Sequence, residues 1–185
     1  AAPACALFGL DDDLGFGLPI EYDGDVTLPQ LDLPSEGAGQ AAPQDIDLPV
    51  ELPPVPIDLA SKSPELDANK DKLERLEIVE LWVTPEGNTL TAELPPLDLY
   101  IGPPSGAGES NSARIATIPA IGPGDGRTAA TLHADGMDAA QDFLLALDFA
   151  FLLGTPTIKA GSIVPGGSVR LKLEYTVRAT VDPTN

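Results

Sequence analysis

The last part of the chain alternates strictly between apolar and polar side chains. From Val169 to Val181 every odd position is apolar and every even position is polar or charged. A β-strand produces this pattern, because its successive side chains point to opposite faces and one face is buried. The turn residues Pro165, Gly166 and Gly167 come directly before it. We therefore predict a long strand over 169–181 with one face in a core.

Other segments show the same strand pattern over shorter lengths. The clearest is 76–84, which the turn residues 85–88 separate from a second alternating run at Leu90, Ala92 and Leu94. Two alternating runs around a turn are typical of a β-hairpin, so we expect one here. Further strands are predicted at 97–101, at 114–118, and at 148–153 leading into 157–159.

Two short helices fit between these strands. Ser63 can cap a helix with Pro64 at its first position, which is favourable for proline, and this helix should run to about Leu73. Asp138 can cap a second helix, with Gln141 completing a capping box. The odd positions from 143 to 153 are also compatible with a strand, so the boundary between helix and strand stays open there.

The first sixty residues contain a recurring motif of an apolar residue, an acid, leucine and proline. It occurs at 31–34, 46–49 and 50–53, and again later at 92–95. In an extended chain the two apolar side chains face one way and the acid faces the other. Proline lacks a backbone donor, so such segments suit the edge of a sheet better than its centre.

These patterns together predict a mainly β protein: an antiparallel β-sandwich with two short helices, preceded by an extended Pro-rich N-terminal arm. The arm comprises residues 1–60 and the sandwich domain residues 61–185. Many short strands between Gly and Pro turns favour a sandwich or barrel. The core residues that we expect are Ile78, Trp82, Leu97, Leu99, Ile101, Ile115, Leu147, Phe151, Leu171, Leu173, Tyr175 and Val177.

Composition and charge narrow the possible functions. The 185 residues contain 29 Asp and Glu against 10 Lys and Arg, which gives a formal net charge of −19. Twelve of the acids lie in the first sixty residues, where there is no Lys or Arg. Such a chain repels a phosphate backbone, so we expect no binding to nucleic acid. The single cysteine excludes an internal disulfide and, with a single histidine, a Cys/His zinc site.

The N-terminal residues favour an exported protein. The chain begins with small residues, Ala1 to Ala4, as a mature chain does after removal of a signal peptide. We expect it outside the cell or at the cell surface, with the periplasm as an alternative. A lipid anchor at Cys5 is a lesser alternative, because the residues before Cys5 match a lipoprotein cleavage site only loosely. No apolar run is long enough for a transmembrane helix.

The residue patterns of common enzymes are missing. His133 stands beside Leu132 and Ala134 without a nearby cysteine, which favours a structural histidine. No serine lies in a Gly-x-Ser-x-Gly motif, and no glycine-rich loop ends in Gly-Lys-Ser/Thr. We therefore predict that the protein is not an enzyme and needs no cofactor.

Calcium is the one ion that the sequence suggests. Hard cations bind several flexible oxygen ligands, and Asp11, Asp12 and Asp13, with Asp23 and Asp25, form short acidic clusters in expected loops. A solvated acidic turn is the commoner explanation of such clusters. Calcium thus stays a weak alternative, together with a glycan as the ligand of an exported monomeric binding module.

The main functional expectation is a structural subunit of an extracellular or cell-surface assembly such as a filament or sheath. We expect the arm to pair as an added strand with a neighbouring subunit, through self-association or with other proteins. The alternative is that the arm folds back onto its own domain. The contact residues predicted are Ile46, Leu48, Val50, Leu52, Val55, Ile57 and Leu59 of the arm, and Arg170, Lys172 and Arg178 on the final strand.

Overall fold

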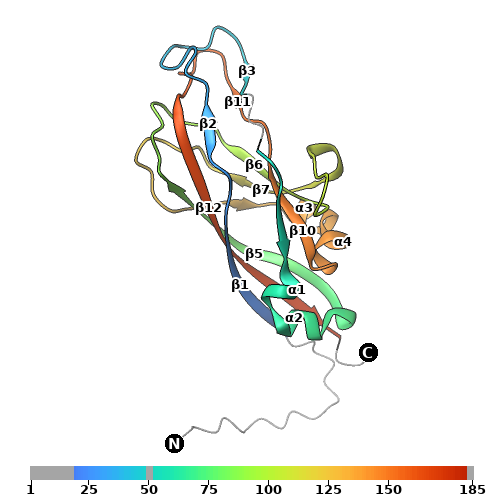
Figure 1. The fold of residues 1–185 in the computed structure, drawn as a ribbon. Coiled ribbons are helices and arrows are strands. Elements are labelled where there is room, and N and C mark those ends of the chain that lie inside the picture. The colour runs from blue at the N-terminus through green and yellow to red at the C-terminus, as the bar shows by residue number, and fades with distance from the viewer. Residues whose placement is uncertain (1–18, 49–51, 183–185) are drawn as a thin grey trace, which may run out of the picture.

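The structure is a computed structural model that describes residues 19–48 and 52–182, and it is an antiparallel β-sandwich (Figure 1). Every strand pair that it describes is antiparallel. The two main sheets pack face to face, and Tyr175 of one sheet meets Phe151 of the other with ring centroids 5.6 Å apart. The predicted fold class is thereby confirmed.

The first sheet is built around the two longest strands, which run along most of the molecule (Figure 1). Its order is β1-β12-β5-β8, and β2 pairs with the beginning of β12. The strands are β1 (Pro19–Thr27), β2 (Leu31–Leu33), β5 (Leu73–Glu86), β8 (Thr128–Ala129) and β12 (Gly167–Val181).

The second sheet has the order β4-β10-β6-β7-β9. Its strands are β4 (Val55–Asp58), β6 (Leu97–Gly102), β7 (Ala113–Ile118), β9 (Thr131–Leu132) and β10 (Asp148–Leu153). A small separate sheet, drawn at the top of Figure 1, pairs β3 (Ile46–Asp47) with β11 (Thr157–Ile158).

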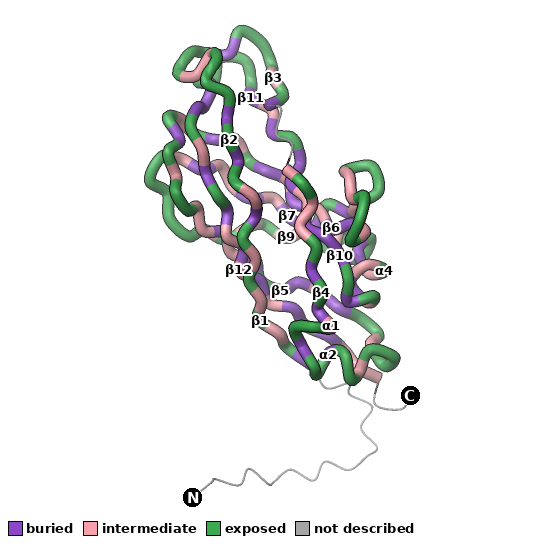
Figure 2. The backbone as a smooth tube through the Cα atoms, in the orientation of Figure 1, coloured by how far each residue is buried: buried purple, intermediate pink, exposed green. Residues whose placement is uncertain are grey.

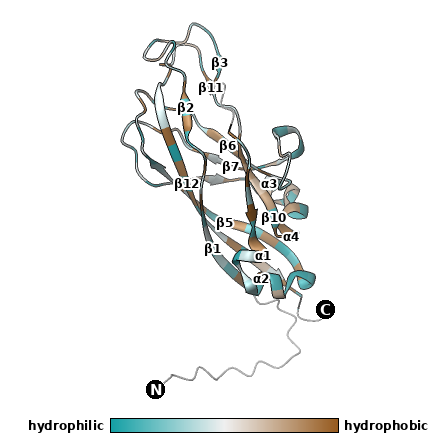
Figure 3. Cartoon of the chain, in the orientation of Figure 1, coloured by the Kyte–Doolittle hydropathy of each residue, from teal (hydrophilic) through white to brown (hydrophobic). Residues whose placement is uncertain are grey.

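The core lies between the two main sheets. Along β12 the odd positions from 169 to 179 are buried and the even positions face outward, as the alternation predicts. Figure 2 colours the chain by burial, and Figure 3 shows hydrophobic and hydrophilic residues side by side along β12. Every expected core residue is buried except Trp82. The pairing of β5 with β12 shifts at Val79, where Thr176 pairs with Glu80 and Val177 with Ile78. This β-bulge reverses the phase of the strand, and Trp82 therefore faces outward.

Four short α-helices lie in the described part of the chain, rather than the two predicted. They are α1 (Leu59–Lys62), α2 (Pro64–Ala68), α3 (Ala134–Ala139) and α4 (Gln141–Leu145), and 3₁₀ turns lie at Lys70–Lys72 and Glu109–Asn111. The predicted cap is confirmed: the Ser63 hydroxyl accepts a hydrogen bond from the Leu66 N–H at 3.3 Å, and Pro64 opens α2.

The predicted capping box at Asp138 is wrong. Asp138 lies inside α3 and forms an ion pair with Arg75. The Gln141 side chain instead bonds to the backbone N–H and C=O of Leu76, which fastens α4 to β5. The boundary left open in the sequence is now settled, because α4 ends at Leu145 and β10 begins at Asp148.

The hairpin predicted after residues 85–88 is also absent. The backbone N–H groups of Thr89 and Thr91 donate to the carbonyls of Ser168 and Gly166, so the chain continues beside the start of β12 instead of turning back on β5. β5 takes β12 and β8 as its partners. β12 can pair with β5 over many more residues than the short run at Leu90 could, so β12 takes this place beside β5.

The described segments of the arm belong to the sandwich of the same chain. β1 and β2 pair with β12, β3 pairs with β11, and β4 pairs with β10. In the structure these described segments fold back on the domain of their own chain, which is the alternative that the sequence left open. No helix in the described ranges has the length and hydropathy to cross a membrane.

Candidate functional site

The two lateral sides of the sandwich are built differently. On one side, which we call the closed side, residues 128–133 run from one sheet to the other. Residues of this segment pair first with β5 and then with β7. The Ala130 N–H donates to the Leu81 carbonyl at 2.9 Å, and the His133 N–H donates to the Ile115 carbonyl at 2.8 Å. One continuous segment thus joins both sheets at this side.

The opposite side, which we call the open side, ends in β1 and β4. Among the described residues, β1 pairs with β12 only, in an unbroken register of nine residue pairs. Just beyond β1, the Leu28 N–H donates to the Leu171 carbonyl at 2.8 Å, in the same register. In an antiparallel pair the direction of the backbone groups alternates, so the even residues of β1 bond to β12. The N–H and C=O groups of Glu21, Asp23, Asp25 and Thr27 consequently face away from the sheet.

No backbone hydrogen bond within the described ranges uses these outward groups. Pro19, at the start of β1, follows the same alternation, so its missing N–H falls on the unpaired side, where proline is tolerated. β1 therefore presents an unpaired edge of four successive donor and acceptor sites, from Glu21 to Thr27. Such an edge is a template for another strand.

The edge of β4 is much less suited to pairing. The Leu59 N–H donates to the Leu147 carbonyl at 2.7 Å, so the odd residues of β4 bond to β10 and the even residues face outward. One of these even residues is Pro56, which has no N–H, and the strand is only four residues long. Short length and proline are two ways in which proteins block an edge. On the open side, β1 is therefore the available edge.

Three acids along β1, Glu21, Asp23 and Asp25, form what we call the acidic row on the outer face of the sheet. Arg178 forms an ion pair with Glu21 at 2.8 Å, and the Thr176 hydroxyl donates to Asp23 at 2.6 Å. Lys172 lies 3.9 Å from Asp25. These exposed pairs contribute little stability each, about 0–1 kcal/mol, but they fix the register of β1 on β12.

At the open side, some apolar side chains beside the core are only partly shielded from solvent. The apolar side chains of Tyr22, Val26, Leu52 and Val55 are only partly buried where they pack against the core. Tyr175 extends from β12 beneath Gly24 of β1, where a Cβ atom would lie 2.7 Å from its hydroxyl.

That hydroxyl is buried and has no hydrogen-bond partner among the residues described. Burial, followed by the charges of Tyr22 and Asp25, raises the pKa of Tyr175 well above its usual range. The pKa of Tyr22 is also raised, by burial first and then by Asp25. We call the partly buried residues Tyr22, Val26, Leu52 and Val55 the apolar seam. The open side thus combines this seam, a Tyr175 hydroxyl without a described partner, and the acidic row.

The structure places most of the predicted contact residues inside this chain. Leu48, Ile57 and Leu59 are buried in its own core, and Ile46, Leu52 and Val55 pack partly against that core. Val50 lies outside the described residues, as do Cys5, Asp11, Asp12 and Asp13. The acid–base complementarity between arm and final strand exists within one chain. Lys172 and Arg178 pair with β1, and Arg170 stands opposite Glu86.

The arm segments that pair with β12 are β1 and β2, whereas the segments 46–52 and 55–59 singled out in the sequence contain β3 and β4, which pair with β11 and β10. The signal of β1 is present in the sequence, because Ile20, Tyr22 and Val26 alternate with the acidic row. Gly24 interrupts the apolar positions and makes residues 23–25 look like a turn. The prediction that Asp23 and Asp25 lie in a loop is wrong for this reason.

The described part of the chain contains no group of three or more Asp, Glu, His or Cys side chains placed to hold a metal ion. Asp23 already accepts the Thr176 hydroxyl, and Lys172 stands near Asp25, so both carboxylates face groups that compete with a cation. The two acids come from one strand and supply too few oxygens for calcium.

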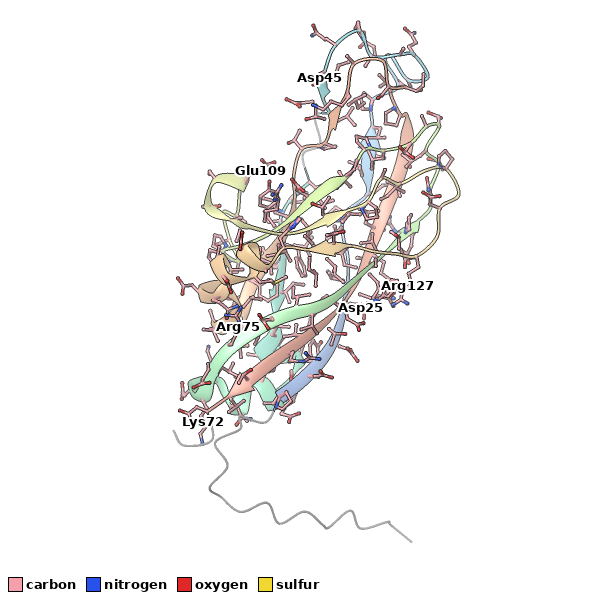
Figure 4. The ribbon with its side chains drawn as sticks, turned by 180° about the vertical axis from the view of Figure 1, so that it is seen from behind. Asp25, Asp45, Lys72, Arg75, Glu109 and Arg127 are labelled. Atoms are coloured by element: carbon pink, nitrogen blue, oxygen red, sulfur yellow. The ribbon has the colours of Figure 1, made fainter. Side chains whose placement is uncertain are left out.

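A hollow of about 360 Å³ lies on the outer face of the first sheet, around Trp82 and Arg127. Arg127 stacks on the indole, 4.4 Å from the ring centroid, and also pairs with Glu174 at 3.0 Å. Figure 4 shows Asp25 and Arg127 near one another on this face. Because the guanidinium covers the exposed face of the indole, that face is not free to stack on a sugar.

A second hollow, of about 920 Å³, lies between β6 and residues 154–163 and includes Asp98 and Tyr100. Beside it, the Thr117 hydroxyl donates to Asp98 at 2.7 Å and lies 2.9 Å from Nε2 of His133. A hydrolytic triad needs the acid on the histidine, which then activates the hydroxyl. Here the acid contacts the hydroxyl itself and Arg114, so the order of the groups is wrong for that chemistry.

Comparison with known proteins gives little further information. No protein-family model matches the sequence, and no curated protein matches it significantly. Solved structures with a similar arrangement come from turnip yellow mosaic virus, a mud crab tombus-like virus and a virus-like particle of the nodavirus of the prawn Macrobrachium rosenbergii.

Their sequence identities to this chain are 9%, 9% and 12%, and their TM-scores are 0.33, 0.36 and 0.34. Each alignment covers 100% of this chain and 92%, 92% and 93% of the other chain, in the same order. At these scores the likeness carries no argument, and the conclusions below rest on the chain's own geometry.

Proposed function

We propose that this chain is a non-enzymatic structural subunit of an exported protein assembly, such as a filament, a sheath or a surface complex. In this proposal its N-terminal strand joins it to a neighbouring subunit. The observation that carries the proposal is the unpaired edge of β1, which lies on the open side of the sandwich. Strand addition to a free edge is a common way in which proteins bind one another.

The chemistry of the described residues supports a binding role rather than a catalytic one. The only histidine contacts a threonine that already donates to an aspartate. The net charge of −19 also opposes binding to nucleic acid.

The neighbour contact differs from the one expected from the sequence. Because the arm segments pair within their own chain, the proposal assigns the contact to the outward side of β1 rather than to the whole arm. Exchange of the arm between two copies would reproduce the same strand pairs between chains, as in domain swapping.

A disulfide distinguishes these two possibilities. Thr27 and Lys172 are directly opposite on β1 and β12, at a pair of residues whose backbones do not bond each other. The variant Thr27→Cys/Lys172→Cys, made with Cys5→Ala, can form a bridge there because the Cα atoms of such pairs are within reach. Pairing within one chain yields an oxidised monomer on a non-reducing gel. An oxidised dimer would show exchange between copies.

The test of the proposed function is the native mass of the protein in the cells that make it. We expect size-exclusion chromatography with light scattering on native extracts to give a mass well above the 19.2 kDa of one chain. Asp23→Pro removes one outward N–H and should lower that mass. Asp23→Asn removes the same charge but keeps the N–H, and it should assemble. A monomeric native protein would overturn the proposal.

The location outside the cell is part of the same proposal, and fractionation of the producing cells tests it. An exported monomer that binds calcium or a glycan remains the alternative function. It predicts a monomer whose melting temperature rises on addition of its ligand.

A further inference from the structure

We propose that the free edge of β1 binds an extended segment of a different protein, in which basic residues alternate with apolar or hydroxyl residues. This inference rests on the proposed function and names the chemistry of the partner. Three observations on the open side carry it: the unpaired backbone of β1, the acidic row, and the unused hydroxyl of Tyr175.

The backbone fixes which residues of the partner face the acids. An antiparallel strand added to β1 would place its hydrogen-bonded residues opposite Glu21, Asp23, Asp25 and Thr27. The side chains of those partner residues would share the outer face with the acidic row, at close cross-strand distance. Opposite charges in such pairs are favourable and like charges are not, so these positions select Lys or Arg.

The alternate positions of the partner face the apolar seam. They would cover Tyr22 and Val26, which are only partly buried in this chain. The central one of these partner residues lies opposite Gly24, and Tyr175 lies beneath Gly24. Tyr175 is 2% exposed, and its hydroxyl has no described hydrogen-bond partner. A Ser or Thr side chain at that position would offer this hydroxyl a partner, which is favourable because a buried polar group without a partner costs free energy. The pattern is therefore basic residues outside, apolar residues inside, and a hydroxyl at the centre.

A second copy of this chain is a poorer occupant. Two β1 strands related by a two-fold axis at Asp23 would place Asp23 opposite Asp23 and Glu21 opposite Asp25. These like-charge pairs oppose association, as charges on natural edge strands do. The excess of acids over bases in the whole chain, 29 against 10, acts in the same direction.

The experiment uses the full chain and a synthetic peptide as long as the nine residues of β1. Its sequence, Val-Lys-Val-Lys-Thr-Lys-Val-Lys-Val, places Thr opposite Gly24 when Lys lies opposite the acidic row. We expect saturable binding by calorimetry. We also expect hydrogen exchange to slow about tenfold or more at the amides of Glu21, Asp23, Asp25 and Thr27, which gain partners.

The control peptide carries a methyl group on the backbone nitrogen of each lysine. It keeps every charge but cannot donate hydrogen bonds to β1, so we expect binding about tenfold weaker or more. A matched pair of chain variants tests the same point: Asp23→Pro should weaken binding of the unmodified peptide more than Asp23→Asn does.

Equal binding of both peptides would show attraction between polyions only and would overturn the inference, as would the absence of binding. The result is separable from the proposed function. A native assembly whose chain ignores the peptide contradicts the partner chemistry alone. A native monomer that binds the peptide contradicts the structural role alone.

Discussion

On the closed side of the sandwich, residues 128–133 hydrogen-bond to both sheets, whereas on the open side β1 and β4 each pair with one neighbour. The edge strand β1 on the open side has nine residues, whereas β8 and β9 on the closed side have two residues each. The closed side joins the two sheets through one segment, and by the same alternation only the backbone groups of Ala129 and Leu132 in this segment face outward. The open side has four successive outward backbone sites on β1, beside the buried Tyr175 hydroxyl that has no described partner.

The two faces of the arm have different roles in this account: one contributes to the core, and the other is available for binding. Its inward side chains belong to the core, and Ile20, Ile57 and Leu59 are among the buried residues. Its outward backbone and the acidic row contribute little to the stability of the single chain. A binding role can therefore be lost by substitution on the outer side of β1 while the fold is kept.

Deletion of residues 1–60 should have the largest effect of all. It removes β1, β2, β3 and β4, and with them the buried residues that these segments contribute to the core. We expect the truncated chain to show no cooperative thermal unfolding by circular dichroism. A truncated domain that melts cooperatively would mean that the arm is not part of the core.

A single methyl group should distinguish the two sides. At Gly136 in α3, beside the closed side, a Cβ atom would overlap the Arg114 carbonyl oxygen, which belongs to the backbone of β7. At Gly24 on the open side it would meet the end of the Tyr175 ring, 2.6 Å away, and that ring can shift toward the open side.

We therefore expect Gly136→Ala to destabilise the protein by about 1–3 kcal/mol, as overpacking does, and Gly24→Ala to cost less. Urea unfolding of both variants measures this difference. A larger cost at Gly24 would show that the open side is as tightly packed as the closed side.

Tyr175→Phe should have a smaller effect of opposite sign. It removes a buried hydroxyl that has no described partner, while the edge contact between its ring and Phe151 remains. We expect the free energy of unfolding to rise by about 1 kcal/mol, since an unsatisfied buried polar group costs about that much. A fall of similar size would show that the hydroxyl is already hydrogen-bonded in solution.

Removal of calcium should have the smallest effect. The carboxylates of Asp23 and Asp25 face Thr176 and Lys172 on a regular strand. We expect the same melting temperature with and without a chelator. A decrease of several degrees on chelation would restore calcium binding as an alternative, by ligand linkage.

The sequence predicted the parts of this fold that have long, regular periods. β12 follows directly from its alternation, and β6, β7 and β10 lie where their apolar patterns place them. The Ser63 cap was visible because the cap and the proline at the first helical position are local signals. Local chemistry and periodicity were sufficient for these elements.

The open edge could not be found in the same way. Gly24 hides the alternation of β1, yet it is glycine because the Tyr175 ring occupies the place of its side chain. The bulge at Val79, which turns Trp82 outward, depends on the register with β12 and has no local signal. The closing strands β8 and β9 contain two residues each, too few for any period. All three features are set by contacts between distant segments.

Hydrogen exchange along β1 tests the central claim most directly. In the dissociated chain, the amides of Glu21, Asp23, Asp25 and Thr27 should exchange rapidly, while those of the even residues bonded to β12 exchange slowly. In the native assembly, all of them should exchange slowly, because a neighbouring strand then covers the edge. Rapid exchange at the odd positions of β1 in the intact assembly would contradict the account, because the subunits would then be joined elsewhere.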